Sequence, residues 1–258
     1  SEDVGSIGGK ARNLAELCKI EGILVPKGFC VKSIAFDEFA NPICLPALVY
    51  KISDIEESSD EIRKVVKRQP IPKAIVNEII EGVKTLQEPL AVRSSATLED
   101  SKEYSFAGQQ DSYLNVTKND IVDAIRACWA SLYNVRALSY RAHIGIDKIG
   151  SMGVVVQDMV KAQKSGVVAT VHPTTRDHDI IFINANWGFG DTVVSGEVNP
   201  DEYYIRKSDG EALLQKINKK NIISCVDNGV FTKKDISNNE IAKQPCLCNE
   251  DLSKLYYA

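Results

Sequence analysis

The stretch AVRSSATLEDSKEYSFAGQQDSYLNV, residues 91–116, decides the fold because it begins and ends as a β-strand. Apolar and small residues at 90–95 predict a short strand, and SYLNV at 112–116 predicts a second strand. Between them lie small hydroxyl residues, acids and Gly108, a composition typical of a loop. The sequence therefore predicts two strands joined by a polar loop, with Arg93 held on the first strand.

An arginine fixed beside such a loop has the chemistry to bind a polyanion. The guanidinium of Arg93 matches two phosphate oxygens, and Gly108 permits close approach of the backbone. Hydroxyl groups such as those of Ser94 and Ser95 offer further donors, and the loop could close as a lid. The alternative is a solvated loop with a surface arginine, and composition alone favours that alternative.

A second cation follows a double glycine in SIGGKARNL, residues 6–14. Lys10 stands at the start of a predicted helix, where the helix dipole favours anions. The spacing differs from that of a P-loop, so this motif alone does not indicate nucleotide binding. An ordinary exposed lysine is the competing interpretation.

The rest of the chain alternates between helical and strand-like segments. Helices are predicted over 57–86, with a break at QPIP (69–72), and over 119–142. The runs at 152–160 and 165–171 are predicted to form a hairpin, and further strands are predicted at 179–187, 201–207 and 212–218. The last forty residues read as irregular until a helix start at 249. This pattern predicts an α+β protein with a boundary near residue 157.

Composition narrows the class of protein. The net charge of −4 and the lack of a long basic tract argue against nucleic acid as a partner. No apolar run approaches the roughly 18–20 residues that span a bilayer, which argues against a membrane partner. The seven cysteines are interpreted as reduced thiols of a cytoplasmic protein, and Cys246-x-Cys248 lacks a second pair for zinc. The three histidines are interpreted as structural.

Ordered blocks across almost the whole chain resemble the N-terminal ATP-binding domain of the phosphoenolpyruvate synthase family. This family is grouped with pyruvate phosphate dikinase, rifampin phosphotransferase and glucan water dikinase. The blocks are GGKARNLAEL, VPKGF, AVRSSATLEDS, SFAGQQDSYLNV, WASLYNVRALSYRAHIG, VVVQDMV, SGVVATVHP, NWGFGDTVVSGEVNPDEYY and QPCL. The resemblance implies an ATP-grasp-like α+β fold with an N-terminal subdomain over 1–156 and an incomplete C-terminal subdomain over 157–258.

The resemblance also implies a nucleotide site and its cofactors, ATP and Mg²⁺. Lys10 and Arg93 would bind and activate the phosphates. Gly108 and Ser112 would belong to the loop that covers the phosphates. The adenine hinge would consist of Gln157, Met159 and Val160. The main magnesium ligands are expected downstream of this chain. Asp191 in GFGD stands where similar proteins show the glutamate of GLGE.

By this resemblance, the intact protein would convert ATP, pyruvate and water to AMP, phosphoenolpyruvate and phosphate. A phosphohistidine on a carrier domain and a separate pyruvate domain would take part, and neither is in this sequence. We therefore expect a fragment that is inactive on its own. Two alternatives stay open: a phosphotransferase with another acceptor, such as rifampin, and a non-catalytic binding module on the same scaffold.

Overall fold

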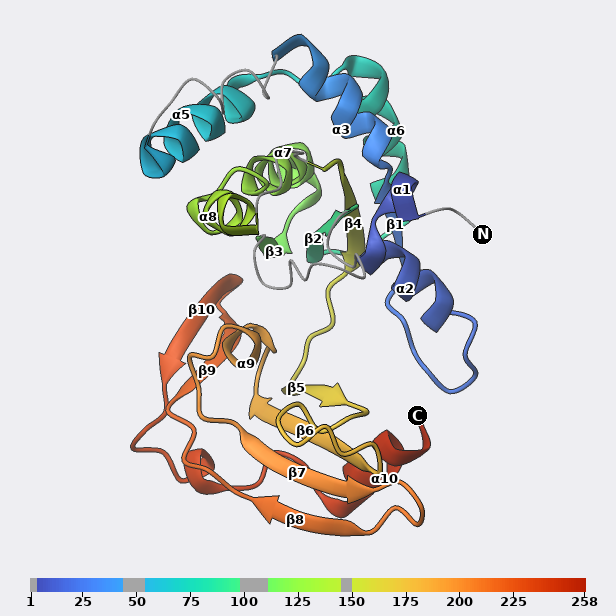
Figure 1. Cartoon of the computed structure of the whole chain (residues 1–258), viewed down its shortest axis with the longest axis vertical. Coiled ribbons are helices and arrows are strands. Elements are labelled where there is room, and N and C mark those ends of the chain that lie inside the picture. Colours follow the sequence, from blue (N-terminus) through green and yellow to red (C-terminus); the bar gives the residue numbers. More distant parts are fainter. Residues whose placement is uncertain (1–3, 44–53, 98–110, 145–149) are drawn as a thin grey trace. The chain divides into compact units, whose positions relative to one another are not determined.

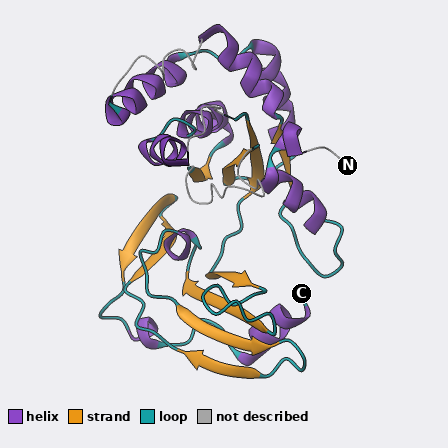
Figure 2. Cartoon of the chain, in the orientation of Figure 1, coloured by secondary structure: helices purple, strands orange, loops and turns teal. Residues whose placement is uncertain are grey.

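The computed structural model describes residues 4–43, 54–97, 111–144 and 150–258 (Figures 1 and 2). Contacts divide the chain into two units, Ser1–Met159 and Val160–Ala258. Both units combine helices and strands, which confirms the predicted α+β class. Within the described ranges, no helix combines the length and the apolar character needed to cross a membrane.

The first unit is built on a four-stranded antiparallel sheet. Its strands are β1 (Gly28–Val31), β2 (Leu90–Ala96), β3 (Ser112–Val116) and β4 (Met152–Asp158), in the order β1-β4-β2-β3. The strand β4 pairs with β1 on one side and with β2 on the other. The run of valines in β4 is therefore buried at the centre of the sheet, as β-branched residues favour.

Helices cover one face of this sheet. They are α3 (Ser33–Ala40), α5 (Ile55–Arg68), α6 (Lys73–Lys84), α7 (Ile121–Ser131) and α8 (Val135–Ile144), and several of them arch over the sheet in Figure 1. Trp129 is fully buried in this core, and the centroid of its ring lies 4.8 Å from that of Phe39. Val92, Val154 and Val156 of the sheet belong to the same core.

Two short helices precede this layer, α1 (Val4–Ile7) and α2 (Gly9–Leu17). Ile7 and Ala11 form a smaller apolar cluster with Val155 of β4. Because neighbouring residues of a strand point to opposite faces, Val155 faces away from the helical core that contains Val154 and Val156. The helix α2 therefore lies on the opposite face of the sheet.

The second unit is a four-stranded antiparallel meander with a separate hairpin. The meander strands are β5 (Lys164–Ala169), β6 (Ile180–Trp187), β7 (Asp201–Arg206) and β8 (Ala212–Lys216). The hairpin joins β9 (Ile222–Asp227) to β10 (Val230–Asp235). A short helix, α9 (Asp191–Val194), follows β6, and α10 (Asn249–Tyr257) packs its Leu252 into the core of the meander.

A buried ion pair ties the segment after β8 to the meander. Lys220 Nζ lies 2.6 Å from Asp201 Oδ1, and both side chains are fully buried. Asp201 also accepts hydrogen bonds from the backbone N–H groups of Asn218 and Cys246, and Lys220 donates to the carbonyl of Gln244. One carboxylate and one ammonium therefore hold three separate stretches of chain together.

Three sequence predictions about elements are wrong. The helix predicted over 119–142 is two helices, because Asn134 Oδ1 accepts a hydrogen bond from Ala137 N and begins α8 anew. The predicted hairpin of 152–160 with 165–171 does not form, since β4 pairs with β1 and β2 while β5 pairs with β6. The segment read as irregular contains the β9–β10 hairpin, whose turn has Asn228 and Gly229 at positive φ.

Candidate functional site

The start of α2 is held directly against the end of β2. Gly8 has a φ of 78°, and a Cβ atom there would lie 2.1 Å from the carbonyl oxygen of Ser95. Three residues on, the backbone N–H of Ala11 donates to Ser95 Oγ over 3.0 Å. Only glycine permits this close approach, so Gly8 fixes where the first turn of α2 lies.

This docking places Lys10 beside the strand that carries Arg93. Lys10 Nζ donates a hydrogen bond of 2.7 Å to the carbonyl oxygen of Ser94, the residue that follows Arg93. The two cations that the sequence singled out are 83 positions apart along the chain. The structure brings the Lys10 ammonium to the backbone of the residue next to Arg93.

Strand register sets the direction of Arg93. Its Cα partners are Ser112 on β3 and Val155 on β4. Directly opposed residues of an antiparallel sheet share a face, so Arg93 and Ser112 lie on the face that Val155 presents to α2. Arg93 is half-buried and Ser112 is exposed. Gly108, which was also predicted for this end of the site, lies outside the described residues.

The two serine hydroxyl groups of β2, those of Ser94 and Ser95, lie inside the first unit. Ser95 Oγ accepts the hydrogen bond from α2, and Ser94 is fully buried in the strand. Because Ser94 lies between Arg93 and Ser95, its side chain points to the helical face. Because both Ser94 and Ser95 are fully buried, the expectation that they donate to phosphate is not supported by their positions.

Burial keeps two titratable groups of the first unit, Tyr113 and Cys128, in their neutral forms. Burial raises the pKa of the Tyr113 hydroxyl to about 12, and the nearby charge of Asp111 adds to this shift. Burial also raises the pKa of the Cys128 thiol well above its usual value, and the charge of Lys10 only partly opposes it. Neither group carries a negative charge that would compete with phosphate for the two cations.

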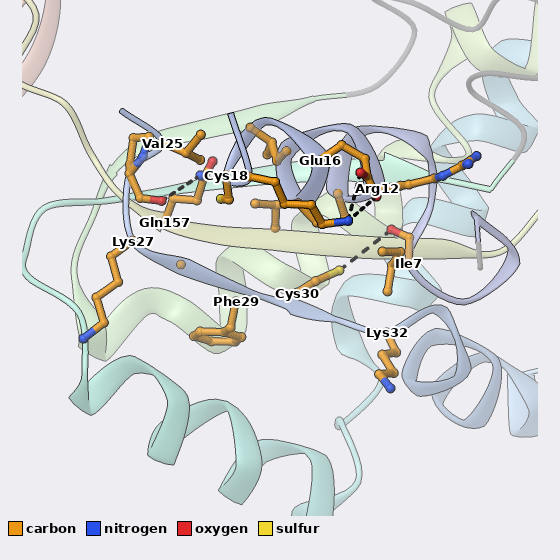
Figure 3. Close-up of a pocket in the computed structure, with 17 residues that line it drawn as sticks. Ile7, Arg12, Glu16, Cys18, Val25, Lys27, Phe29, Cys30, Lys32 and Gln157 are labelled. Carbon is orange, nitrogen blue, oxygen red and sulfur yellow. Dashed lines mark hydrogen bonds and ion pairs between the residues drawn. The ribbon is translucent and has the colours of Figure 1, made fainter. Parts of the chain in front are cut away.

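Gln157 lies on the same face of the sheet as Arg93. Its side chain lines a cavity whose lining does not include Arg93. Its Cα partners are Ala91 on β2 and Gly28 on β1, and its side chain is only 5% exposed. The amide Nε2 donates to the carbonyl oxygen of Pro26 over 3.2 Å. The same side chain lines a cavity of about 600 Å³ between α2 and β1, shown in Figure 3.

The other two predicted hinge residues follow β4. The backbone N–H of Met159 donates to the carbonyl oxygen of Pro89, and its Sδ lies 3.0 Å from the backbone nitrogen of Asn115. Met159 is therefore fixed against β2 and β3, with its N–H already bonded. Val160 is 60% exposed and begins the second unit.

The glycine-bearing loop after β6 ties its acids to the β9–β10 hairpin. Asp191 Oδ2 accepts a hydrogen bond of 2.8 Å from Ser224 Oγ, and Glu197 pairs with Lys233 over 2.6 Å. The hydrogen bond from Lys233 lowers the pKa of Glu197 below its usual value. The sequence indicated the acids but not Ser224 or Lys233, because the hairpin that carries them was not predicted.

A family model and individual relatives assign this chain to the same protein family. The family model described as the pyruvate phosphate dikinase AMP/ATP-binding domain matches residues 4–257. A probable phosphoenolpyruvate synthase of Methanothermobacter thermautotrophicus is 39% identical over 253 residues, which cover 91% of this chain and 37% of that protein. The phosphoenolpyruvate synthase of Aeropyrum pernix is 39% identical over 258 residues, covering 93% of this chain and 31% of that protein.

A second named activity occurs among the relatives. A rifampicin phosphotransferase of a Streptomyces species is 35% identical over 265 residues, covering 98% of this chain and 30% of that protein. The chain thus spans between 30% and 37% of the length of these three relatives.

Proposed function

Because this chain belongs to the family of the pyruvate phosphate dikinase AMP/ATP-binding domain, we propose that it is the nucleotide-binding part of a phosphoenolpyruvate synthase-like dikinase. The intact protein would convert ATP, pyruvate and water to AMP, phosphoenolpyruvate and phosphate. A histidine on a carrier domain outside this chain would carry the phosphoryl group. One observation carries the proposal: Lys10 is anchored to the backbone of the residue next to Arg93.

Lys10 and Arg93 would hold the phosphates of ATP in different ways. The planar guanidinium of Arg93 can bind two oxygens at once, whereas the ammonium of Lys10 acts as a compact charge. Ser112, exposed and directly opposite Arg93, would add a hydroxyl donor on the same face. Charge that develops on a transferred phosphoryl group would be stabilised by these fixed positive groups.

The base would be held where β4 leaves the sheet. We assign this role to Gln157, Met159 and Val160, with Gly108 covering the phosphates at the other end. Since the N–H of Met159 is bonded to Pro89, Met159 would contact the base through its side chain or its carbonyl oxygen. Val160 would add apolar contact, as its exposed side chain allows.

Magnesium enters the proposal only through parts of the intact protein outside this chain. Among the residues that the structure describes, no three His, Cys, Asp or Glu side chains are grouped as a metal site requires. Asp191 and Glu197 are engaged by Ser224 and Lys233 instead. In the intact protein, magnesium would be held by the phosphates of ATP together with ligands outside this chain.

Calorimetric titration of the chain with ATP and magnesium tests the assignment of Arg93. Arg93→Ala should weaken binding by about 1.5–3 kcal/mol, the value of a hydrogen-bonded charge. Arg93→Lys should also weaken binding, because the charge remains but the planar fork is lost. Arg68→Ala, at the exposed end of α5, serves as the matched control. Equal affinities for Arg93→Ala and Arg68→Ala would contradict the proposed role.

A phosphotransferase with another acceptor is the second candidate. The rifampicin phosphotransferase of the Streptomyces species matches nearly as well as the synthases, at 35% against 39% identity. Acceptor choice can be tested on the intact protein with ATP and either pyruvate or rifampicin, followed by mass spectrometry of the products. Phosphoenolpyruvate would support the synthase proposal, and phosphorylated rifampicin would support the alternative. Formation of neither product, with ATP still bound, would indicate a non-catalytic module.

A further inference from the structure

The helix α2 begins without a side-chain cap of its own. Its N-cap residue is Gly8, which has no side chain, and no cap hydrogen bond forms there. The N–H groups of the first helical turn have no intrahelical acceptors, and a side-chain oxygen of the N-cap residue normally accepts from the second or third of them. In α2 such an acceptor has to come from another part of the chain.

Ser95 of β2 supplies this acceptor. Its Oγ accepts a hydrogen bond of 3.0 Å from the backbone N–H of Ala11, the third residue of α2. This is the bond that a serine at the N-cap itself would make, but the serine lies 84 positions farther along the chain. Ser95 is fully buried, so water does not compete for its hydroxyl group. The strand β2 therefore caps the helix.

Two small residues that face each other in the sheet make room for this arrangement. Ser95 is paired with Gly153 of β4, and directly opposed residues share a face. A Cβ atom at Gly153 would lie 2.5 Å from the carbonyl oxygen of Ile7, the last residue of α1. The junction of α1 and α2 thus rests on the surface that Ser95 and Gly153 form. Backbone contacts at both residues limit how far the first turn of α2 can move.

The neighbouring serine makes no comparable side-chain bond. Ser94 Oγ is buried without a hydrogen-bond partner among the described residues. It is the backbone carbonyl oxygen of Ser94 that holds the Lys10 side chain, over 2.7 Å. On the next residue of each element, the Ser95 hydroxyl group holds the N–H of Ala11. Of these two contacts, only the one at Ser95 depends on which side chain β2 carries.

We propose that Ser95 is a positioning residue of the nucleotide site: its hydroxyl group caps α2 and thereby sets the place of the Lys10 ammonium. The inference rests on the proposed function, in which Lys10 binds phosphate. Ser95 does not itself contact the nucleotide, because its side chain is buried against α2. Without the cap the first turn of α2 would fray, and Lys10 lies in that turn.

Calorimetric titration with ATP and magnesium compares Ser95→Ala with the wild type. The affinity of the variant for ATP should fall by about three- to tenfold, because an uncapped first turn no longer holds Lys10 in one place. Adenosine lacks phosphates and should bind to both proteins equally. Ser131→Ala, the matched control, removes another fully buried hydroxyl group, which donates to the carbonyl oxygen of Cys128, and should bind ATP as the wild type does. An equal loss for ATP and adenosine, or no loss for ATP, would overturn the proposal.

A second variant separates the hydrogen bond from the volume of the side chain. Ser95→Cys has nearly the same size, but sulfur is a weak hydrogen-bond acceptor, so its affinity for ATP should fall as that of Ser95→Ala does. Hydrogen exchange followed by mass spectrometry should be faster over Gly9–Leu17 in both variants and unchanged there in Ser131→Ala, with circular dichroism confirming the fold. Wild-type affinity or wild-type exchange in Ser95→Cys would overturn the proposal.

A double-mutant cycle tests whether Ser95 acts through Lys10. Added to Lys10→Met, Ser95→Ala should change the affinity for ATP by less than about twofold, since the cation that it positions is absent. The full loss in that background would overturn the positioning role. If Lys10→Met weakens ATP binding but Ser95→Ala does not, this inference fails and the proposed function stands. If neither Lys10→Met nor Arg93→Ala weakens it, the proposed function is contradicted, and the positioning role with it.

Discussion

The ammonium of Lys10 lies 2.7 Å from the carbonyl oxygen of Ser94. This acceptor belongs to the backbone of β2, whose position is set by pairing with β4. The lysine is therefore anchored to an atom that every residue at position 94 would provide. The position of the cation depends on the docking of α2 rather than on the identity of its partner.

Removal of the Lys10 charge should weaken nucleotide binding without unfolding the chain. For Lys10→Met we expect the affinity for ATP to fall by roughly 1.5–3 kcal/mol, because a charge-assisted hydrogen bond to phosphate is lost. Calorimetric titration measures the change. Lys64→Met on α5, where the lysine forms an exposed pair with Glu61, is the control. Matching affinities in the two variants would remove Lys10 from the site.

A methyl group at Gly8 should move α2 away from β2. In Gly8→Ala the new Cβ would meet the carbonyl oxygen of Ser95, so the helix must shift together with Lys10. We expect a loss of stability of about 1–3 kcal/mol from clash and positive φ, and weaker ATP binding. Gly22→Ala is the matched control, because Gly22 also has positive φ but its new methyl group would meet no described atom within 4 Å. Its stability should fall less, and its ATP affinity should not change.

The buried pair of Asp201 and Lys220 should be sensitive to loss of either partner. Lys220→Met leaves a carboxylate buried without its counter-charge, for which we expect a loss of about 3–5 kcal/mol in the free energy of unfolding. Urea denaturation followed by circular dichroism measures this value. Lys219→Met changes an exposed neighbour and should have little effect. A similar loss in both variants would mean that the ion pair does not stabilise the fold.

The contact between Lys164 and Asp251 should make stability depend on pH in the acid range. The hydrogen bond from Lys164 and that from the N–H of Cys248 lower the pKa of Asp251 to about 2, from an ordinary 3.8. The stabilisation is therefore complete above pH 4 and is lost as the pH falls toward 2. Its size should be at most about 2 kcal/mol, since the side chain is partly exposed.

Comparison of Asp251→Asn with the wild type reveals this dependence. The difference in the free energy of unfolding should be largest near neutral pH and should shrink as the pH falls below 4. Asp227→Asn, which removes an exposed pair with Lys234, is the control and should show little difference at any pH. A difference for Asp251→Asn that does not change with pH would contradict the assigned cause.

Much of the first unit could be predicted from local pattern. The strands around Arg93, the break at QPIP and the helix start at Gly9 follow from periodicity, proline and glycine. The family resemblance is confirmed by the match over residues 4–257. The pairing partners of the strands were harder to predict. The strand β4 is apolar along most of its length, and its sequence has no alternation of polar and apolar residues that would show whether it lies at an edge or at the centre of the sheet.

The candidate site was only partly accessible from sequence. Lys10 and Arg93 were identified as cations, but the placement of Lys10 against the backbone of Ser94 depends on the contact of Gly8 with Ser95, which no local pattern encodes. The cavity beside Gln157 was missed because its lining joins residues 7–32 to two residues of β4. The roles of Gly108 and of the hinge residues stay predictions.

Side chains along β2 point alternately to the two faces of the sheet, and this limits which insertions and deletions the strand can accept during evolution. Arg93 lies between Val92, which fills the helical core, and Ser94, so neighbouring side chains of the strand leave it on opposite sides. Deletion or insertion of one residue in β2 would turn the arginine into the core and a valine toward α2. Length changes inside this strand are therefore tolerable only in pairs, so we expect homologues to vary in length at its ends rather than within it.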